Sequence, residues 1–356
     1  MTLSRRRFLA GAAGAGLAGG LPLSAARAQV ADLLAGMKGR QLVVTTWGGS
    51  TADAFRAAYF KEFGETFGIE IIEDSPPSDA RIKAMVEAGN VTIDVADKGT
   101  YTVHGLGEAG LLEEIDYSVV DASGIPESSV SKYGCGNYSW TQLLAFRTDV
   151  YTEDQPDSVT ALFDVERFPG IRGMRDDPVM NLVYALLADG VPANDIYPLT
   201  EEKIARAYAK IDSIKDHILW WDSGAQTQQL LSAGEVSMIG MWNGRVDNLL
   251  TEGLPIGVTW NGTQFATDSW VVPKGAPNKD VAMAFIAWSS LPENNAKFSD
   301  HITYGPVNRN AFSNIKEERR AMIPSTYIDE MVICDYNWWG PNYVAQAERW
   351  KEWRLG

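Results

Sequence analysis

Six loop segments combine side chains that could bind a small charged molecule. They are Trp47-Gly48-Gly49-Ser50, Gly99-Thr100-Tyr101, Arg175-Asp176-Asp177, Trp242-Asn243-Gly244-Arg245, Phe265-Ala266-Thr267-Asp268 and Tyr304-Gly305-Pro306. An indole face attracts an ammonium or onium group, a buried carboxylate needs a cationic partner, and the planar arginine fork matches a carboxylate. These residue types favour noncovalent recognition of a charged solute.

The elements that must position these segments follow an α/β pattern, in which short apolar runs alternate with stretches of helical period. Strands are predicted over residues 42–47, 69–72, 93–96, 143–148, 236–242, 256–260 and 268–273. Helices are predicted after Gly48-Gly49, with Phe55, Tyr59 and Phe63 on one face, and over 81–88, 200–212, 226–233 and 279–290. Ligands of such sheets collect at the carboxyl ends of the strands.

The first 28 residues resemble a twin-arginine export signal. Arg5-Arg6-Arg7 precedes an Ala/Gly/Leu stretch, and Ala26-Arg27-Ala28 offers a small-x-small cleavage site. Five glycines and Pro22 make residues 9–25 too weakly apolar for a membrane anchor. The pattern predicts cleavage after Ala28 and a periplasmic protein; the alternative is a basic N-terminus that arose by accident.

The charge and the cysteine content exclude several classes of function. The formal net charge of −15 repels nucleic acid and anionic lipid. Cys135 and Cys334 predict either one bridge or two buried thiols. The three histidines stand alone, and no cysteine spacing matches a zinc site, so no metal, haem or other cofactor is predicted.

Taken in order along the chain, several segments resemble the spermidine/putrescine branch of the extracellular solute-binding proteins of ABC importers. The resemblance spans the whole chain after the leader. Its residues are Trp47, Gly99 to Val103, Gly110-Leu111-Leu112, Asp176-Asp177, Ser237 to Gly244, Asp268 to Pro273, Tyr304 to Asn308 and Asn337-Trp338-Trp339. It implies a monomeric protein that captures a small solute and delivers it to a permease of the inner membrane.

The resemblance also implies a fold, namely the two-lobe α/β fold of type II periplasmic binding proteins, with a ligand cleft between lobes joined by crossover strands. Together with the restart of the β/α pattern after Arg147, it predicts an N-terminal lobe of residues 29–148 and 268–314. The C-terminal lobe would comprise residues 149–267 and 315–356, with hinges near Phe146–Thr148 and Thr267–Ser269.

In that family, aromatic side chains clamp the ligand and acids bind its amine groups. The matching positions in this chain are Trp47, Tyr101, Asp177, Trp242, Asp268 and Tyr304. The resemblance thus implies that Asp268 binds a cation inside an aromatic box that includes Trp47, Tyr101 and Trp242.

Two departures from the family pattern change the expected ligand. Met180 stands where the polyamine binders carry a second carboxylate, and Arg245 follows Trp242-Asn243-Gly244. Such a site suits one cation and one carboxylate, as in γ-aminobutyrate, another ω-amino acid or a betaine-like zwitterion. Binding of putrescine or spermidine is the alternative.

Some of these residues have a second interpretation. Asp177 before Pro178 also fits a helix N-cap with proline at the first helical position. Arg245 could pair with Asp247 or a surface acid instead of a ligand.

The anion has a second candidate site, because Ser50 and Thr51 follow Gly48-Gly49 at a helix start whose N–H groups could bind it. The tryptophans of the C-terminal region are expected to pack within a lobe, with a place for Trp338 at the cleft rim left open.

A secreted carbohydrate-active enzyme is the more remote alternative, because twelve tryptophans and many carboxylates also suit a glycosidase. Such an enzyme needs two carboxyl groups at a fixed separation, which a sequence does not reveal. The chain has no Gly-x-Ser-x-Gly and no His-Glu-x-x-His motif. We therefore predict that the protein is not an enzyme.

Overall fold

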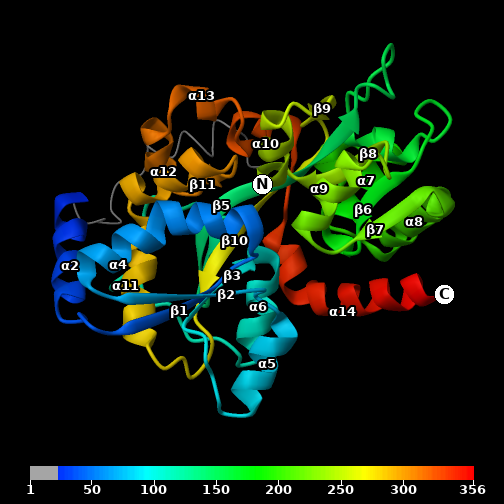
Figure 1. Ribbon diagram of the computed structural model, residues 1–356. Coiled ribbons are helices and arrows are strands. Elements are labelled where there is room, and N and C mark those ends of the chain that lie inside the picture. The colour runs from blue at the N-terminus through cyan, green and yellow to red at the C-terminus, as the bar shows by residue number, and fades with distance from the viewer. Residues whose placement is uncertain (1–22) are drawn as a thin grey trace. The chain divides into compact units, whose positions relative to one another are not determined.

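The computed structural model describes residues 23–356, which form two compact units. The N-terminal unit contains residues 23–139 and Thr267–Met322, and the C-terminal unit contains Trp140–Ala266 and Ile323–Gly356. Two strands, β5 (Gly134–Arg147) and β10 (Gln264–Val271), each run from one unit into the other (Figure 1). The sequence analysis divided the chain after residues 148, 267 and 314, whereas the units divide after residues 139, 266 and 322.

The N-terminal unit contains the first three strands of the sequence prediction, as β1 (Gln41–Thr45), β2 (Glu70–Asp74) and β3 (Val95–Gly99). Besides parts of β5 and β10, its other strands are β4 (Val130–Ser131) and β11 (Gly305–Pro306). Its α-helices are α2 (Leu23–Ala35), α3 (Gly49–Phe55), α4 (Lys61–Phe67), α5 (Asp79–Glu87), α6 (Thr100–Glu108), α11 (Lys279–Ser290), α12 (Pro292–His301) and α13 (Glu317–Arg320). Short 3₁₀ helices cover Glu127–Ser129 and Arg309–Asn314.

The sheet of this unit brings three predicted segments together at one end of its strands. Its order is β2-β1-β3-β10, with β2, β1 and β3 parallel and β10 antiparallel to β3. Because of this antiparallel pairing, Asp268 lies opposite Gly99, the last residue of β3. Trp47 follows the end of β1, the parallel neighbour of β3. The segments containing Trp47, Gly99 and Asp268 therefore meet at this end of the strands.

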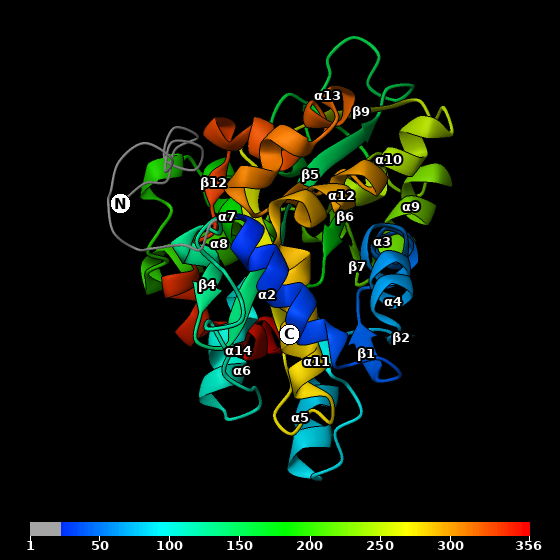
Figure 2. The same ribbon diagram turned by 90° about the vertical axis from the view of Figure 1, so that its left-hand side faces the viewer.

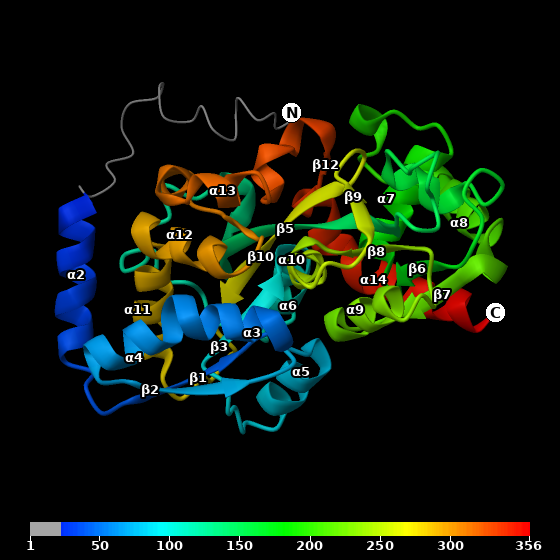
Figure 3. The same cartoon turned by 45° about the horizontal axis from the view of Figure 1, so that its top comes forward.

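The core of the unit includes the predicted aromatic face of the helix that follows Gly48-Gly49, which packs against α12. A π-helical turn, Arg56–Phe60, joins α3 to α4 in one continuous helical run (Figure 3). Phe55, Tyr59 and Phe63 are fully buried, as predicted, and the ring of Phe55 stacks on Phe298 with centroids 4.3 Å apart. Helix α2 lies along α11 (Figure 2). Its buried Val30 and Leu34 follow the predicted cleavage site after Ala28.

The C-terminal unit has a second sheet, of order β5-β8-β6-β7, with β9 paired to β5 and β12 paired to β10. Its own strands are β6 (Arg172–Arg175), β7 (Ile218–Trp221), β8 (Met238–Trp242), β9 (Ile256–Thr259) and β12 (Val332–Ile333). Its α-helices are α7 (Pro178–Ala188), α8 (Glu201–Asp212), α9 (Gly224–Ser232), α10 (Asn243–Thr251) and α14 (Tyr336–Leu355). Short 3₁₀ helices cover Val159–Phe163, Ala193–Asp195, Lys215–His217, Pro324–Thr326 and Ile328–Glu330.

Most of the predicted elements are confirmed, and helix α11 has the predicted bounds of residues 279–290. The sequence analysis made no prediction for α12 or α14 and considered α7 only as an alternative role for Asp177. The leader lies outside the described residues as far as residue 22, and Leu23 begins α2. Within residues 23–356, no helix combines the length and apolar character needed to span a bilayer.

Candidate functional site

In the N-terminal unit, the predicted cation-binding acid contacts a predicted aromatic residue. Asp268 is buried in β10, and its Oδ2 accepts a hydrogen bond of 2.7 Å from Nε1 of Trp47. The indole N–H is a fixed donor, so it stabilises the charged form of the carboxylate. The structure therefore brings Asp268 and Trp47 together, although the edge of the indole, and not its face, contacts the acid.

Two residues that the sequence analysis missed complete this group. Asp97 of β3 is fully buried, and the hydroxyl of Tyr138 in β5 lies 3.0 Å from Oδ2 of Asp97 and 2.9 Å from Oδ2 of Asp268. Burial raises the pKa of Asp97 well above its ordinary value, and the nearby charge of Asp268 raises it further. Burial, followed by the charges of Asp268 and Asp97, likewise raises the pKa of Tyr138. We call these four residues, Trp47, Asp97, Tyr138 and Asp268, the acidic cluster.

The two predicted tyrosines adjoin the acidic cluster. Tyr101 packs over the backbone of Gly99, where an added Cβ would lie 2.6 Å from its ring, and Gly99 is the strand partner of Asp268. Tyr304 stacks on Tyr138 with ring centroids 4.9 Å apart. Both tyrosines are buried. Tyr304 thus contacts the cluster through Tyr138, and Tyr101, in α6, lies beside the strand residue opposite Asp268.

A cation of the protein itself faces the aromatic ring of Trp47. The Lys98 ammonium lies 5.4 Å from the Trp47 ring centroid, pairs with Asp79 and donates to the Pro77 carbonyl at 2.6 Å. The aromatic box stays a prediction, and Lys98 is a neighbour that it did not include. Ser50 lies in the first turn of α3, while the neighbouring Thr51 is buried.

In the C-terminal unit, the predicted Trp242 and Arg245 are buried neighbours. Trp242 ends β8, and α10 begins at the next residue, which places Arg245 in its first turn. Both side chains pack against Gly224, where an added Cβ would lie 2.6 Å from Nε of Arg245 and 3.1 Å from Cε3 of Trp242. A larger residue than glycine at position 224 would therefore displace the guanidinium or the indole.

A second arginine joins this pair. The guanidinium carbon of Arg175 lies 5.1 Å from the centroid of the Trp242 ring, within the range of a cation–π contact. The rings of Trp221 and Trp140 meet Trp242 edge-on, with centroids 5.3 and 6.4 Å away. We call Arg175, Trp242 and Arg245 the arginine cluster; Arg175 stood in a predicted segment but was not itself a predicted site residue.

Asp177 has the structural role that the sequence analysis kept as an alternative. Its side chain accepts the Val179 N–H at 2.9 Å as the N-cap of α7, with Pro178 at the start of the helix. It also pairs with Arg175 at 3.9 Å. Ligand binding by Asp177 stays a prediction, whereas its helix cap is confirmed. Met180, one turn later, is buried in α7.

The C-terminal tryptophans pack within their unit, as expected. Trp339 and Trp350 are buried in α14. Oδ1 of Asp176 accepts hydrogen bonds from Nε1 of Trp350 at 2.7 Å and from Nε of Arg354 at 3.0 Å. Asp176 therefore ties α14 to the segment before α7. Trp338 is half-buried, and its ring meets Trp339 edge-on.

Of the two alternatives for the cysteines, the structure shows two buried free thiols. Cys135 belongs to the N-terminal unit and Cys334 to the C-terminal unit. Burial raises the pKa of Cys135 to about 12, so its thiol stays protonated at neutral pH. Across residues 23–356, histidine, cysteine and carboxylate side chains form no group of three that could bind a metal ion.

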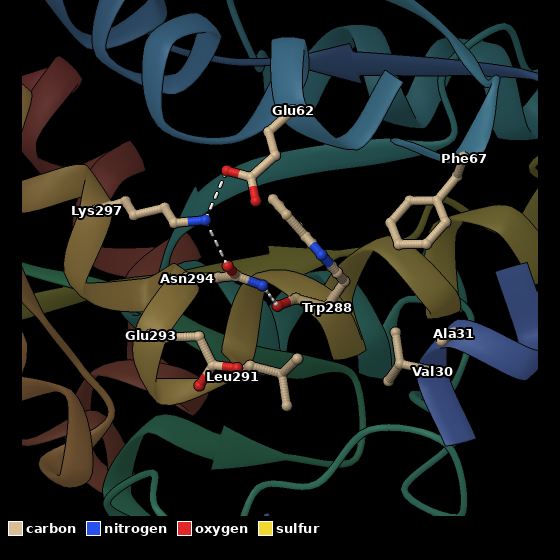
Figure 4. A pocket seen from close by; sticks show the side chains of 9 residues that line it. All are labelled: Val30, Ala31, Glu62, Phe67, Trp288, Leu291, Glu293, Asn294 and Lys297. Carbon is tan, nitrogen blue, oxygen red and sulfur yellow. Dashed lines mark hydrogen bonds and ion pairs between the residues drawn. The ribbon is translucent and has the colours of Figure 1, made fainter. Parts of the chain in front are cut away.

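A surface pocket of about 300 Å³ in the N-terminal unit contains none of the predicted site residues (Figure 4). Its walls come from α2, α4, α11 and α12. Glu62 and Asn294 at its rim already bind Lys297, whose Nζ donates to Glu62 at 2.6 Å and to Asn294 at 2.9 Å. The pocket is therefore separate from the acidic cluster.

Comparisons with known proteins place the whole fold in a transport family. Residues 58–320 match the model of the family described as bacterial extracellular solute-binding protein. A γ-aminobutyric acid-binding protein of Pseudomonas aeruginosa is 34% identical over 316 residues, 87% of each chain. A solved structure of a γ-aminobutyrate receptor is 36% identical, with a TM-score of 0.80 over 88% of this chain and 97% of that one.

A second solved structure has the same fold. The periplasmic binding protein of an Agrobacterium tumefaciens strain, solved with agropinic acid, is 32% identical, with a TM-score of 0.82 over 89% of this chain and 99% of that one. These matches confirm the predicted α/β fold of two-lobe periplasmic binding proteins. They also confirm a role in solute binding for transport. The chain belongs to the bacterial extracellular solute-binding proteins that serve ABC transporters.

Proposed function

We propose that this chain is the periplasmic solute-binding component of an importer for γ-aminobutyrate or a closely similar ω-amino acid. The observation that supports this most is the opposite charge of the two clusters. The acidic cluster supplies the buried Asp268, and the arginine cluster supplies the buried Arg245 and its neighbour Arg175. Two relatives that are more than 30% identical are named for γ-aminobutyrate.

Each end of such a ligand has a suitable partner in this proposal. The carboxylate of Asp268 binds the ammonium group through a charge-assisted hydrogen bond, with Tyr101 and Tyr304 beside it. The planar guanidinium of Arg245 binds the ligand carboxylate in a bidentate manner. Ser50, Trp47 and Trp242 complete the set of ligand-binding residues that we propose.

A diamine fits this set of residues less well. Its second ammonium group would have to meet the arginine cluster, where like charges repel. In the C-terminal unit, Met180 is buried and apolar, and Asp177 already caps α7 and pairs with Arg175. Putrescine and spermidine are therefore the weaker candidates.

The proposed role is binding and delivery without bond chemistry. We propose that the protein acts as a monomer in the periplasm, where a permease of the inner membrane reads its ligand-bound state. Recovery of unchanged ligand after incubation with the protein would separate this role from that of a carbohydrate-active enzyme.

The deciding experiment is a ligand screen on the purified chain without its leader. Thermal shift should show stabilisation by γ-aminobutyrate, because ligand at about 100 times its dissociation constant adds about 2.7 kcal/mol to the free energy of unfolding. Titration calorimetry then ranks γ-aminobutyrate, putrescine, spermidine, a betaine and a neutral sugar. Tight binding of a polyamine with no response to any zwitterion would overturn the proposal.

A further inference from the structure

The acidic cluster contains one hydroxyl hydrogen for two acceptors. The hydroxyl of Tyr138 lies 3.0 Å from Oδ2 of Asp97 and 2.9 Å from Oδ2 of Asp268. A phenol has a single hydrogen to donate, while its oxygen can accept. Both short contacts are good hydrogen bonds only if one of the two acids carries a proton and donates it to the phenol oxygen.

The surroundings identify which acid carries that proton. Asp268 accepts the indole N–H of Trp47 on the same oxygen that faces Tyr138, so its charged form is stabilised by two donors. Asp97 is fully buried, and its other contact is a long one of 3.5 Å from Nδ2 of Asn137. A buried acid with so little support avoids a large desolvation penalty by remaining neutral.

We infer that Asp97 is a positioning residue that works in its protonated form: it donates to the phenol oxygen of Tyr138, which turns the phenol hydrogen toward Asp268. The cluster then carries a single negative charge, located on Asp268. The consequence for ligand binding rests on the proposed function. A single negative charge in this unit matches a ligand with one ammonium group.

The other groups around Asp97 agree with this arrangement. Lys98, the next residue along β3, is directed to Asp79 and to the Pro77 carbonyl. Tyr59 is buried, and its hydroxyl lies 3.5 Å from Nδ2 of Asn295. Burial and the charge of Asp268 raise the pKa of Asp97, and its hydrogen bonds with Tyr138 and Asn137 and the charge of Lys98 lower it only in part.

A neighbouring acid shows the opposite arrangement and provides a matched control. Asp94, three residues earlier, is also fully buried. It accepts three N–H donors: the backbone of Val43 at 2.9 Å, and the backbone and side chain of Asn278 at 2.8 and 3.1 Å. An N–H group can only donate, so all three contacts require lone pairs of Asp94, as a carboxylate provides.

Infrared spectroscopy of the ligand-free protein tests the protonation directly. With aspartate isotope-labelled at its side-chain carboxyl, the wild type at neutral pH should show the carbonyl band of a protonated carboxylic acid. The band should vanish in Asp97→Asn and persist in Asp94→Asn, or in the exposed Asp53→Asn if Asp94→Asn does not fold. Absence of the band from the wild type, or its persistence in Asp97→Asn, would overturn the inference.

Calorimetry with γ-aminobutyrate tests the positioning role. Asparagine can donate from its amide as the protonated acid does, so Asp97→Asn should lose no more than about tenfold in affinity, the effect of one neutral hydrogen bond. Asp97→Ala, which has no donor for Tyr138, should bind more weakly than Asp97→Asn. Asp268→Asn should lose at least about thirtyfold.

Two results of this titration would contradict the inference: a loss in Asp97→Asn as large as that in Asp268→Asn, which would mean that Asp97 is charged, or equal binding by Asp97→Asn and Asp97→Ala. Failure of the wild type to bind any zwitterion would instead refute the proposed function. The infrared band of the free protein would still decide the state of Asp97.

Discussion

The acidic and arginine clusters use tryptophan in opposite ways. In the acidic cluster, the edge of Trp47 donates its N–H to Asp268, and in the arginine cluster, the face of Trp242 lies against Arg175. The edge of an indole is electropositive and its face electronegative, so each contact matches the charge beside it. In these two clusters, the sign of the charge beside the tryptophan therefore decides which part of its ring faces that charge.

The clusters differ further in how their charge responds to pH. Guanidinium groups stay protonated throughout the accessible range, so the charge of the arginine cluster is fixed. The acidic cluster contains two acids whose charges interact, and the raised pKa of Asp97 means that its total charge depends on pH. The charge of the arginine cluster is therefore independent of pH, whereas the charge of the acidic cluster changes with pH.

Loss of the anion should have the broadest effect. Asp268→Asn removes the charge that we assign to ammonium binding, so binding of both γ-aminobutyrate and putrescine should weaken by about 2–5 kcal/mol. Titration calorimetry measures this, with the exposed Asp53→Asn as the control. Undiminished binding of either amine would remove Asp268 from the site.

Loss of the cation should discriminate between ligands. Arg245→Ala should weaken γ-aminobutyrate by about 2–5 kcal/mol if the pair is buried, and leave putrescine unchanged or tighter. The control is Arg206→Ala, which breaks an exposed pair with Asp189. Equal losses for the two ligands would indicate a general collapse of the unit instead of lost charge recognition.

The changing charge of the acidic cluster should appear in the pH dependence of stability. Above the ordinary aspartate pKa of 3.8, folded protein retains a proton on Asp97 that unfolded protein has released, so this acid makes stability fall as pH rises. Asp97→Asn lacks this effect. Its free energy of unfolding relative to wild type should therefore increase with pH, by up to about 1.4 kcal/mol per pH unit until the raised pKa is passed. Urea unfolding at a series of pH values measures it, and a constant difference would contradict it.

The smallest expected effect concerns a glycine of the arginine cluster. Gly224→Ala places a methyl group 2.6 Å from Nε of Arg245, which must shift. Affinity for γ-aminobutyrate should fall by about 1 kcal/mol, and Gly36→Ala, where nothing lies within 4 Å, should leave it unchanged. Equal affinities in both variants would show that the position of Arg245 is not critical.

The fold was largely predictable where an element carries a clear apolar run, as in α11, whose residues from Val281 to Ser290 are all buried. Helix α12 was not predicted from the sequence because it buries polar residues. Its Asn294 and Asn295 donate to the carbonyls of Trp288 and Asn137 at 2.8 and 2.7 Å, partners that no local pattern reveals. Helix α14 was not predicted because it contains Pro341 and because its tryptophans, before and after that proline, form no single apolar stripe.

The candidate site was predictable only as far as the family pattern reached. Trp47, Tyr101, Asp268 and Tyr304 do gather around one group in the N-terminal unit. Asp97 and Tyr138 were missed because their importance depends on strand register and tertiary packing. In the register of β3 and β10, Asp97 pairs with Trp270, and no spacing along the chain shows that Tyr138 lies between two acids. An acid directly after the apolar pair Val95-Ala96 was the available signal, since buried carboxylates are rare without a partner.

The hydrogen bond between Asp176 and Trp350 joins residues that are 174 positions apart in the chain. Bringing such distant segments together costs loop-closure entropy before the contact between them forms. The packing of α14 against α7 is therefore a non-local contact, of the kind that slows the folding of a domain.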